Sequence, residues 1–346
     1  MIVTELNYSP HQLKLKKHFE SNSINIFERN ILLVQLKTNT NIVSIGEIAP
    51  LPGLSIESID ECIQALNSLS GFINDSFGKC TTTDLFAMLN LSNMPCAVIF
   101  GMEQALFSIL FQENNYSLFD DYNIQKEINV NAVLPFGATD EIIATIESKI
   151  NLGYHTFKIK VGRKNFADDL YVLKSIREKF QNKIKIRIDA NCAWTFNQAV
   201  DYLNPLTEFN IEYIEQPVRD IDELIRLSKL SSIPIAVDES INSFQDAESI
   251  LNNSPIDFLV IKPSIIGGIR ETARIIKLAN AVNKKIIISS AFESAIGKRM
   301  LVMLASVTNH NYAHGLDTME YFSNQIIDDS FSVANGKINF SINMLS

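Results

Sequence analysis

Hydrophobic residues recur with two different spacings, and the change from one to the other divides the chain. Up to about residue 124, two segments of β-strand composition, 30–37 and 41–47, flank a polar turn and predict a hairpin. Ser55 is expected to cap a helix whose apolar residues recur at helical spacing, and a second helix is predicted over 97–111. The first part of the chain is therefore predicted to be an α+β domain.

From about residue 125, short β-branched segments alternate with amphipathic ones. The predicted strands are 128–133, 156–161, 184–189, 211–215, 233–238, 258–262, 285–289 and 313–317. The intervals between them have room for a loop and a crossover helix, so the strands should be parallel. Eight such units predict an α/β fold of the (β/α)8 (TIM-like) barrel type. A doubly wound open sheet is the alternative, although no G-x-G-x-x-G motif follows the first strand.

The predicted domains are an α+β capping domain over 1–124 and a catalytic barrel over 125–320. The last segment, 321–346, leaves the strand–helix repeat and is expected to return to the capping domain. Residues 51–54 lie in a segment too rich in proline and glycine for a helix or strand. Together with the polar stretch 21–30, they are expected to cover the barrel mouth as a lid.

Composition narrows the class of protein. With 346 residues, 46% hydrophobic and 20% charged, the chain can bury a sizeable core. A net charge of −9 without a basic stripe argues against binding to nucleic acid or an anionic membrane. No apolar run approaches the ~20 residues that cross a bilayer, and no secretory signal is seen, so a cytoplasmic location is expected. The four cysteines form no C-x-x-C pair and are expected to be free thiols.

Three acids stand at the carboxyl ends of consecutive predicted strands: Asp189, Glu215 and Asp238. Parallel strands bring those ends to one mouth of a barrel, where three carboxylates repel one another unless a cation joins them. An all-oxygen site suits Mg²⁺, with Mn²⁺ as the alternative ion, and no Cys/His cluster offers a zinc site. Each acid taken singly, Asp189 above all, is also explained as a helix N-cap.

Lysines accompany these acids. Apolar and cationic residues alternate over 157–161, so Lys158 and Lys160 share one face, which would point into the barrel. Lys262 ends the strand that follows Asp238. Buried lysine is rare without a partner, and solvated lysines on an edge strand are the alternative. A metal that binds a substrate carboxylate acidifies its α-proton, and a lysine near that metal serves as base more readily. The pattern therefore predicts proton abstraction α to a carboxylate.

The lysine pair, the three acid-ended strands and the further lysine resemble the muconate-lactonising subgroup of the enolase superfamily. Segments 46–55, 189–194, 289–297 and 315–318 are in turn similar to the o-succinylbenzoate synthases of menaquinone biosynthesis. The resemblance covers essentially the whole chain and implies an enolase-like barrel with an N-terminal capping domain. It implies a carbon–oxygen lyase (hydro-lyase) that dehydrates 2-succinyl-6-hydroxy-2,4-cyclohexadiene-1-carboxylate, so the expected partner is a small dicarboxylate.

The same resemblance assigns roles to the charged residues. Lys160 would remove the α-proton, Lys158 would lower the pKa of Lys160 by like-charge proximity, and Lys262 would stabilise the enediolate intermediate by a cation–π contact. The implied Mg²⁺ ligands are Asp189, Glu215 and Asp238.

Further residues are expected around this centre. Ser289, Ser290 and Leu54 are the candidate substrate contacts. The residues expected to support the ligands are Arg187, Asn191 and Glu239. Asn191 is equally explained as a turn residue, and Arg187 as a structural partner of a ligand carboxylate.

Other functions use the same frame. A dipeptide epimerase, as a family trait, would carry Asp-x-Asp at the last strand to hold the substrate ammonium, whereas Asp317 is followed by Thr318 and Met319. An N-succinylamino acid racemase could use Lys160 and Lys262 as two bases. A non-catalytic binding barrel would be expected to lose a ligand or a lysine, and all are present. A Schiff-base aldolase needs one buried lysine but not three acids.

Overall fold

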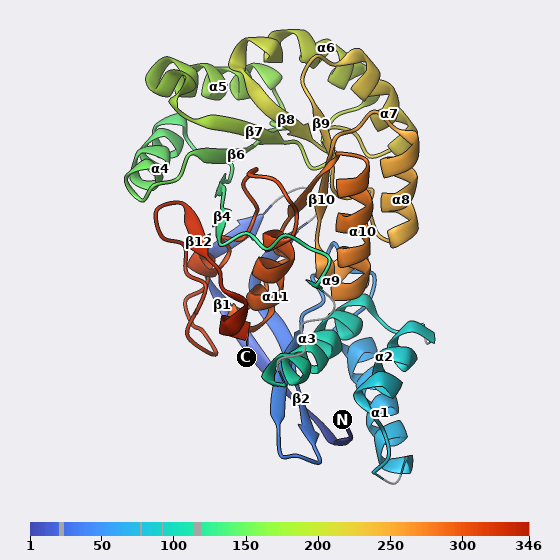
Figure 1. Cartoon of the computed structure of the whole chain (residues 1–346). Helices are drawn as coiled ribbons and strands as arrows, with labels where there is room; N and C mark the ends of the chain where they lie inside the picture. The colour runs from blue at the N-terminus through green and yellow to red at the C-terminus, as the bar shows by residue number, and fades with distance from the viewer. Residues whose placement is uncertain (21–23, 77, 92, 114–118, 346) are drawn as a thin grey trace.

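The computed structural model describes residues 1–20, 24–76, 78–91, 93–113 and 119–345. A sheet and three helices from the N-terminal part lie against one end of a curled parallel sheet, and the C-terminal segment lies beside both (Figure 1). No helix in the described ranges is long and apolar enough to cross a membrane.

The N-terminal sheet is antiparallel, in the order β1 (Val3–Glu20), β2 (Asn25–Thr38), β3 (Val43–Ile48). The predicted hairpin is β2 and β3 and is confirmed. The long strand β1 was not predicted because it is an edge strand: few of its side chains, such as Val3 and Leu13, are fully buried, so its apolar pattern is weak.

Three helices cover this sheet: α1 (Ile59–Asp75), α2 (Thr82–Leu91) and α3 (Cys96–Gln112). The second predicted helix is α3, whereas α2 was missed. The prediction that Ser55 caps α1 is wrong. Ser58 is the cap and forms a reciprocal capping box with Glu61, while the Ser55 hydroxyl accepts a hydrogen bond from the Leu51 amide.

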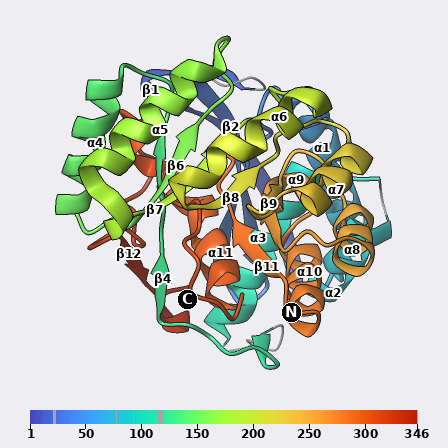
Figure 2. The ribbon, with the colours of Figure 1, turned by 90° about the horizontal axis from the view of Figure 1, so that it is seen from above.

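Seven parallel strands form the barrel sheet in chain order (Figure 2). They are β5 (Ala132–Leu134), β6 (Thr156–Lys160), β7 (Lys185–Asp189), β8 (Ile211–Glu215), β9 (Ile235–Val237), β10 (Phe258–Ile261) and β11 (Lys285–Ile288). Parallel bridges from Val130 to His314 and from Ser289 to Gly315 place the predicted eighth strand between the two sheet edges. The sheet is therefore closed, and the open-sheet alternative is wrong.

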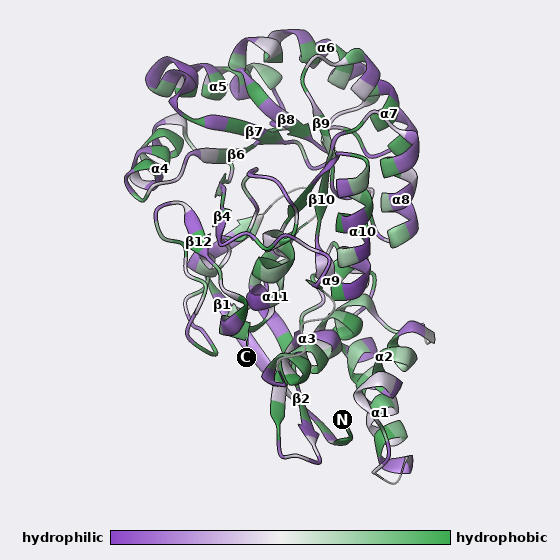
Figure 3. Cartoon of the chain, viewed as in Figure 1, coloured by the Kyte–Doolittle hydropathy of each residue, from purple (hydrophilic) through white to green (hydrophobic). Residues whose placement is uncertain are grey.

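Helices lie outside these strands and bury one face against them. They are α4 (Thr139–Asn151), α5 (Phe166–Phe180), α6 (Phe196–Leu206), α7 (Ile221–Leu230), α8 (Phe244–Asn253), α9 (Pro263–Ile266), α10 (Ile269–Ala281) and α11 (Ala295–Ser306). Figure 3 shows β9 and β10 as mainly hydrophobic and the surrounding helices as two-sided. This amphipathic pattern is why the sequence predicted most of them.

The predicted first barrel strand is two strands. Its first half, β4 (Glu127–Asn129), pairs antiparallel with β12 (Lys337–Asn339), and only β5 joins the barrel sheet. The C-terminal segment also contacts the capping sheet, where the Ser323 amide donates to the Lys14 carbonyl. The segment thus returns to both parts of the molecule rather than to the capping domain alone.

Two buried carboxylates of the capping domain dock onto barrel helices. Glu103 in α3 accepts hydrogen bonds from the amides of Ile269 and Arg270 at the start of α10, and pairs with the Arg270 side chain. Glu47 in β3 accepts from the amide and hydroxyl of Ser294 at the start of α11. Helix N-termini attract anions, so these contacts hold the two domains in a defined relation.

Part of the predicted lid, 21–23, lies outside the described residues. Residues 25–30 of the same stretch belong to β2, and Leu51 is fully buried. Leu54 lines the cavity at the barrel mouth, as expected of a lid residue.

Candidate active site

The barrel topology brings the three acids together. Asp189 and Glu215 are the last residues of β7 and β8 and face each other across the register, and Asp238 directly follows β9. Each is at least nine-tenths buried. The following helices are capped by other residues, namely Thr195, Asp220 and Ser243, so the alternative that these acids are N-caps is wrong.

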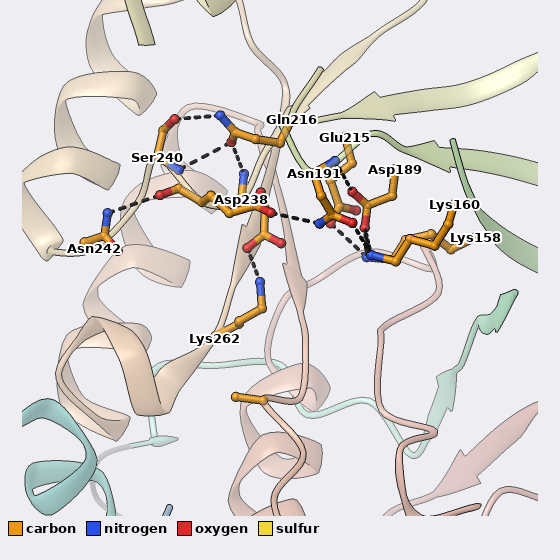
Figure 4. Close-up of polar contacts among 12 residues, drawn as sticks. Lys158, Lys160, Asp189, Asn191, Glu215, Gln216, Asp238, Ser240, Asn242 and Lys262 are labelled. Atoms are coloured by element: carbon orange, nitrogen blue, oxygen red, sulfur yellow. Dashed lines mark hydrogen bonds and ion pairs between the residues drawn. The ribbon is translucent and has the colours of Figure 1, made fainter. Parts of the chain in front are cut away.

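Lysines approach the acids from two sides (Figure 4). The Lys158 Nζ lies 3.0 Å from Asp189 Oδ2 and 2.8 Å from Glu215 Oε1. The Lys160 Nζ lies 2.8 Å from the same Asp189 oxygen. On the other side, Lys262 pairs with Asp238. Since β6 lies inside the sheet and both of its lysines are buried, the alternative of solvated edge-strand lysines is wrong.

The two strand-end carboxylates carry opposite pKa shifts. Burial raises the pKa of Asp189, but Lys158 and Lys160 outweigh this and hold its pKa well below the usual range. Burial and the neighbouring Asp189 raise the pKa of Glu215 to about 8, because Glu215 shares only one of those lysines. The site therefore holds one firmly ionised acid beside one that gains a proton readily.

Burial alone would lower the pKa of the lysines, but the acids reverse this. Asp189 and Glu215 raise the pKa of Lys158 well above its usual value, and Asp238 raises that of Lys262. Without another cation among them, both lysines are charged partners of the acids.

Asn191 connects the lysine side of the site to Glu239. Its side-chain oxygen accepts from the Lys160 Nζ at 2.5 Å, and its Nδ2 donates to Glu239 Oε1 at 2.8 Å. Burial, with Asp238 and Asp189 nearby, raises the pKa of Glu239 to about 7. Asn191 has a positive φ of 43°, so it is a turn residue and a side-chain partner at once.

Sequence reasoning missed Gln216. Its buried side-chain oxygen accepts from the Asp238 amide at 2.8 Å, and its Nε2 donates to the Ser240 hydroxyl at 2.6 Å. It thereby ties the end of β8 to the loop that carries Asp238. Its place between Glu215 and Pro217 was the available signal, but nothing local showed that its side chain crosses to the next strand.

Arg187 lies deeper in the barrel and is fully buried. Its Nε donates to Glu212 Oε2 at 2.6 Å and its Nη1 to the Ala313 carbonyl at 2.6 Å. These contacts agree with a structural partner, although the carboxylate that it binds is Glu212 rather than one of the three strand-end acids.

A cavity opens beside this cluster at the barrel mouth. Ser289, Ser290 and Leu54 line it, as expected for substrate contacts, together with Lys158, Lys160 and Lys262. Its apolar wall comes from both domains and consists of Phe19, Ile24, Val133, Phe292 and Tyr321. The cavity therefore combines three lysines with an apolar wall.

The donor set fits a hard divalent cation in its chemistry. Glu215 Oε2 and Glu239 Oε2 are buried oxygens without a hydrogen-bond partner, and the acids offer only oxygen. Within the described ranges, however, no three His, Cys, Asp or Glu side chains form a ready-made metal group. The lysines pair with the same acids instead, so the metal ligands stay a prediction.

The chain matches the family model described as "Enolase C-terminal domain-like" over residues 141–342. That range includes the three acids and the three lysines of the cluster.

Curated relatives carry three kinds of name. Protein PHYLLO, chloroplastic, of Arabidopsis thaliana is 26% identical over 96% of this chain, which spans only 22% of that protein. An L-Ala-D/L-Glu epimerase of Francisella tularensis subsp. novicida is 29% identical over 66% of the chain and 65% of its own length. An o-succinylbenzoate synthase of Aliivibrio salmonicida is 28% identical over 86% of the chain and 85% of its own length.

Solved structures agree on the fold. The dipeptide epimerase from Enterococcus faecalis V583, complexed with Mg and L-Leu-L-Tyr, has a TM-score of 0.89 at 23% identity, covering 99% of this chain and 98% of that one. MenC from Desulfotalea psychrophila LSv54 has a TM-score of 0.82 at 24% identity, covering 98% of this chain and 100% of that one. At such identities the likeness shows the barrel with its cap and does not separate the activities.

Proposed function

Because the chain belongs to the enolase C-terminal domain-like family, we propose that it is an o-succinylbenzoate synthase, a hydro-lyase that dehydrates 2-succinyl-6-hydroxy-2,4-cyclohexadiene-1-carboxylate. The relatives named o-succinylbenzoate synthase support this activity, and the buried lysine–acid cluster supports proton abstraction α to a carboxylate. The proposed Mg²⁺ ligands are Asp189, Glu215 and Asp238. The bound ion would supply positive charge next to the substrate carboxylate and so acidify its α-proton.

The proposed reaction needs one base and one route for the leaving group. Lys160 takes the α-proton, and the electron pair of that C–H bond moves into the enediolate. As the ring becomes aromatic, the C–O bond breaks, and the hydroxyl leaves as water with the proton that Lys160 took. Lys158 is charged and shares an oxygen of Asp189 with Lys160, so it holds that carboxylate beside the proposed base.

Lys262 stands on the Asp238 side of the cluster, opposite the two lysines of β6 (Figure 4). There it can lie against the other face of the substrate ring and stabilise the intermediate by a cation–π contact. The apolar part of the cavity suits the ring, and the Ser289 hydroxyl lines the same cavity, where it suits a substrate carboxylate. The Ser290 hydroxyl already donates to Glu293, and the amides of both serines donate to backbone carbonyls.

The observation that favours this activity over dipeptide epimerisation is the partnering of Asp317. Its carboxylate accepts from the Tyr154 hydroxyl at 2.6 Å and pairs with the Lys149 Nζ at 3.0 Å. Two residues on, Met319 is buried in an apolar cluster. The last strand therefore offers no unpaired acid at these two positions to hold a substrate ammonium.

N-succinylamino acid racemisation is the second candidate. Lys160 and Lys262 approach the site from opposite sides, which is the arrangement that a two-base racemisation needs. The same cavity could then act on two substrates, and one assay series separates these activities.

The test is an assay of the purified protein with Mg²⁺ on the cyclohexadiene substrate, followed by ultraviolet absorbance of the aromatic product. N-succinylamino acids and L-Ala-L-Glu dipeptides are assayed in parallel for racemisation or epimerisation. Aromatisation that EDTA abolishes supports the proposal. Epimerisation without aromatisation would overturn the assignment, and turnover unaffected by EDTA would overturn the metal requirement.

A further inference from the structure

Arg29 is a buried cation outside the lysine–acid cluster. It lies in the middle of β2 and is 1% exposed. Its surroundings are apolar, since they belong to the cluster that joins the capping sheet to α11 and includes Leu13, Ile31 and Phe292. Burial lowers the pKa of Arg29 to about 10, so the guanidinium stays charged at neutral pH. A charge in such a place is costly unless it is well bonded.

All its hydrogen bonds given by the structure go to backbone carbonyls of two segments. The Nη1 and Nη2 groups donate to the carbonyls of Pro50 at 2.8 Å and of Ala49 at 2.6 Å. The Nε donates to Phe292 at 3.5 Å. The first two carbonyls begin the proline-rich segment that leads to Leu54, and the third, of Phe292, lies between β11 and α11, two residues after Ser290.

Both segments form walls of the cavity at the barrel mouth. Leu54 comes from one, and Ser289, Ser290 and Phe292 come from the other. The second segment has further hydrogen bonds of its own, because the Ser290 hydroxyl and the Ala291 amide donate to the buried Glu293 carboxylate. The negative charge of Glu293 also raises the pKa of Arg29 and so favours the charged guanidinium.

We propose that Arg29 is the positioning residue that sets the two substrate-facing walls, 49–54 of the capping domain and 289–292 of the barrel, in a fixed relation to each other. The planar fork of a guanidinium suits this role because one rigid group satisfies carbonyls that lie far apart in the chain. The substrate role of these walls rests on the proposed function, whereas the coupling between them does not.

The test compares Arg29→Met with Arg177→Met. Arg177 is the control: it also donates to backbone carbonyls, those of Phe209, Ile184 and Asn210 among them, but it is only partly buried and lies away from the cavity. Amide hydrogen exchange followed by mass spectrometry reads the segments 49–54 and 289–294 without any substrate. In Arg29→Met, exchange should rise by about tenfold or more in both segments and stay unchanged in β6–β8. In Arg177→Met both segments should exchange as in the wild type.

Kinetics give the second measurement. Arg29→Met should raise KM for the cyclohexadiene substrate by about tenfold or more with kcat within ~3-fold, because the base and the acids are held by other strands. Arg29→Lys keeps the charge, so its KM should lie between the values of the wild type and of Arg29→Met. Arg177→Met should change KM by less than ~2-fold.

Three results would overturn the proposal: faster exchange in only one segment, uniformly faster exchange across the chain, or equal effects of the two methionine variants. If the wild type does not turn over the cyclohexadiene substrate, the proposed function fails, and the exchange measurement still decides whether Arg29 couples the walls.

Discussion

At the scale of single residues, burial and neighbouring charge together decide protonation in this barrel. Asp189 and Glu215 lie side by side, yet one contacts two lysines and the other contacts one, and their pKa values move in opposite directions. The same balance keeps Lys158 charged beside Lys160. The ion pairs around Lys160 therefore involve residues from three different strands.

Replacing the proposed base tests that chemistry directly. Lys160→Ala should lower kcat by about 10³-fold or more, because general base catalysis typically contributes 10² to 10⁴ and Lys158 stays paired with Asp189 and Glu215. Lys185→Ala, an exposed lysine on β7, serves as control and should keep wild-type turnover. Activity of the Lys160 variant within tenfold of wild type, with unchanged circular dichroism, would remove Lys160 from the mechanism.

One buried histidine, His314, and one partly buried histidine, His310, should make stability depend on pH. Burial lowers the pKa of His310 to about 4 and that of His314 well below its usual value. In the unfolded chain each takes up a proton near pH 6.5, so below that pH the unfolded state binds more protons than the folded one. Their contribution is thus complete above about pH 6.5 and is lost as pH falls toward 4.

Urea unfolding at pH 7 and pH 5 measures this loss. The wild type should lose up to about 1.4 kcal/mol per pH unit for each histidine. His310→Gln should lose less over the same interval, and His155→Gln, at an exposed position, should lose as much as the wild type. An equal loss in the His310 variant and the wild type would contradict the assignment.

At the scale of elements, two helix N-termini of the barrel bind carboxylates of the capping domain. The carboxylate of Glu103 sits at the start of α10, where Gly268 leaves room for it: a Cβ there would lie 2.5 Å from Glu103 Oε2. Glu47 plays the same part at the start of α11. Burial raises the pKa of both acids against these hydrogen bonds, so the docking contacts carry a desolvation cost.

Breaking one docking contact should be costly. Glu103→Gln leaves Arg270 without its anionic partner and should lower the free energy of unfolding by about 3–5 kcal/mol, as for other broken buried pairs. Glu271→Gln removes an exposed pair with Arg274 on the same helix and should cost less than about 1 kcal/mol. Chemical denaturation compares the two variants, and equal losses would show that Glu103 does not dock the helix.

At the scale of the whole molecule, the chain is acidic, yet lysines line the cavity that would hold an anionic substrate. The net charge is −9, yet three lysines line one cavity and pair with three of the acids. Closure of the barrel makes this possible because it brings strands far apart in sequence to one mouth. Net charge therefore says little about what this cavity accepts.

Metal binding should be visible in the stability of the entire chain. An ion that binds only the folded state raises the unfolding temperature, so Mg²⁺ should raise it above the value in NaCl of equal ionic strength. Asp238→Asn should abolish that difference, whereas Asp222→Asn, at an exposed position, should retain it. Differential scanning fluorimetry makes the comparison, and an undiminished Mg²⁺ effect in Asp238→Asn would contradict the predicted ligand.

The sequence by itself determined what depends on local pattern. The β-branched strands, the amphipathic helices and the acids at the strand ends are periodic features, and together they predicted the closed barrel and the cluster of Asp189, Glu215 and Asp238 with the lysines. Parallel strands place their carboxyl ends together by geometry alone, so no long-range information was needed. Where the pattern was weak, as in the edge strand β1, the prediction failed.

Only the tertiary structure decided which side chains cross between elements. Gln216 reaching the Asp238 amide, Glu103 docking α10 and Arg29 joining two segments are contacts between residues far apart in the chain or on different strands. Such contacts produce no periodic pattern in the sequence, because a buried polar group forms hydrogen bonds with whichever groups the fold brings near it. The tertiary structure therefore added the contacts that hold the site and its walls in place.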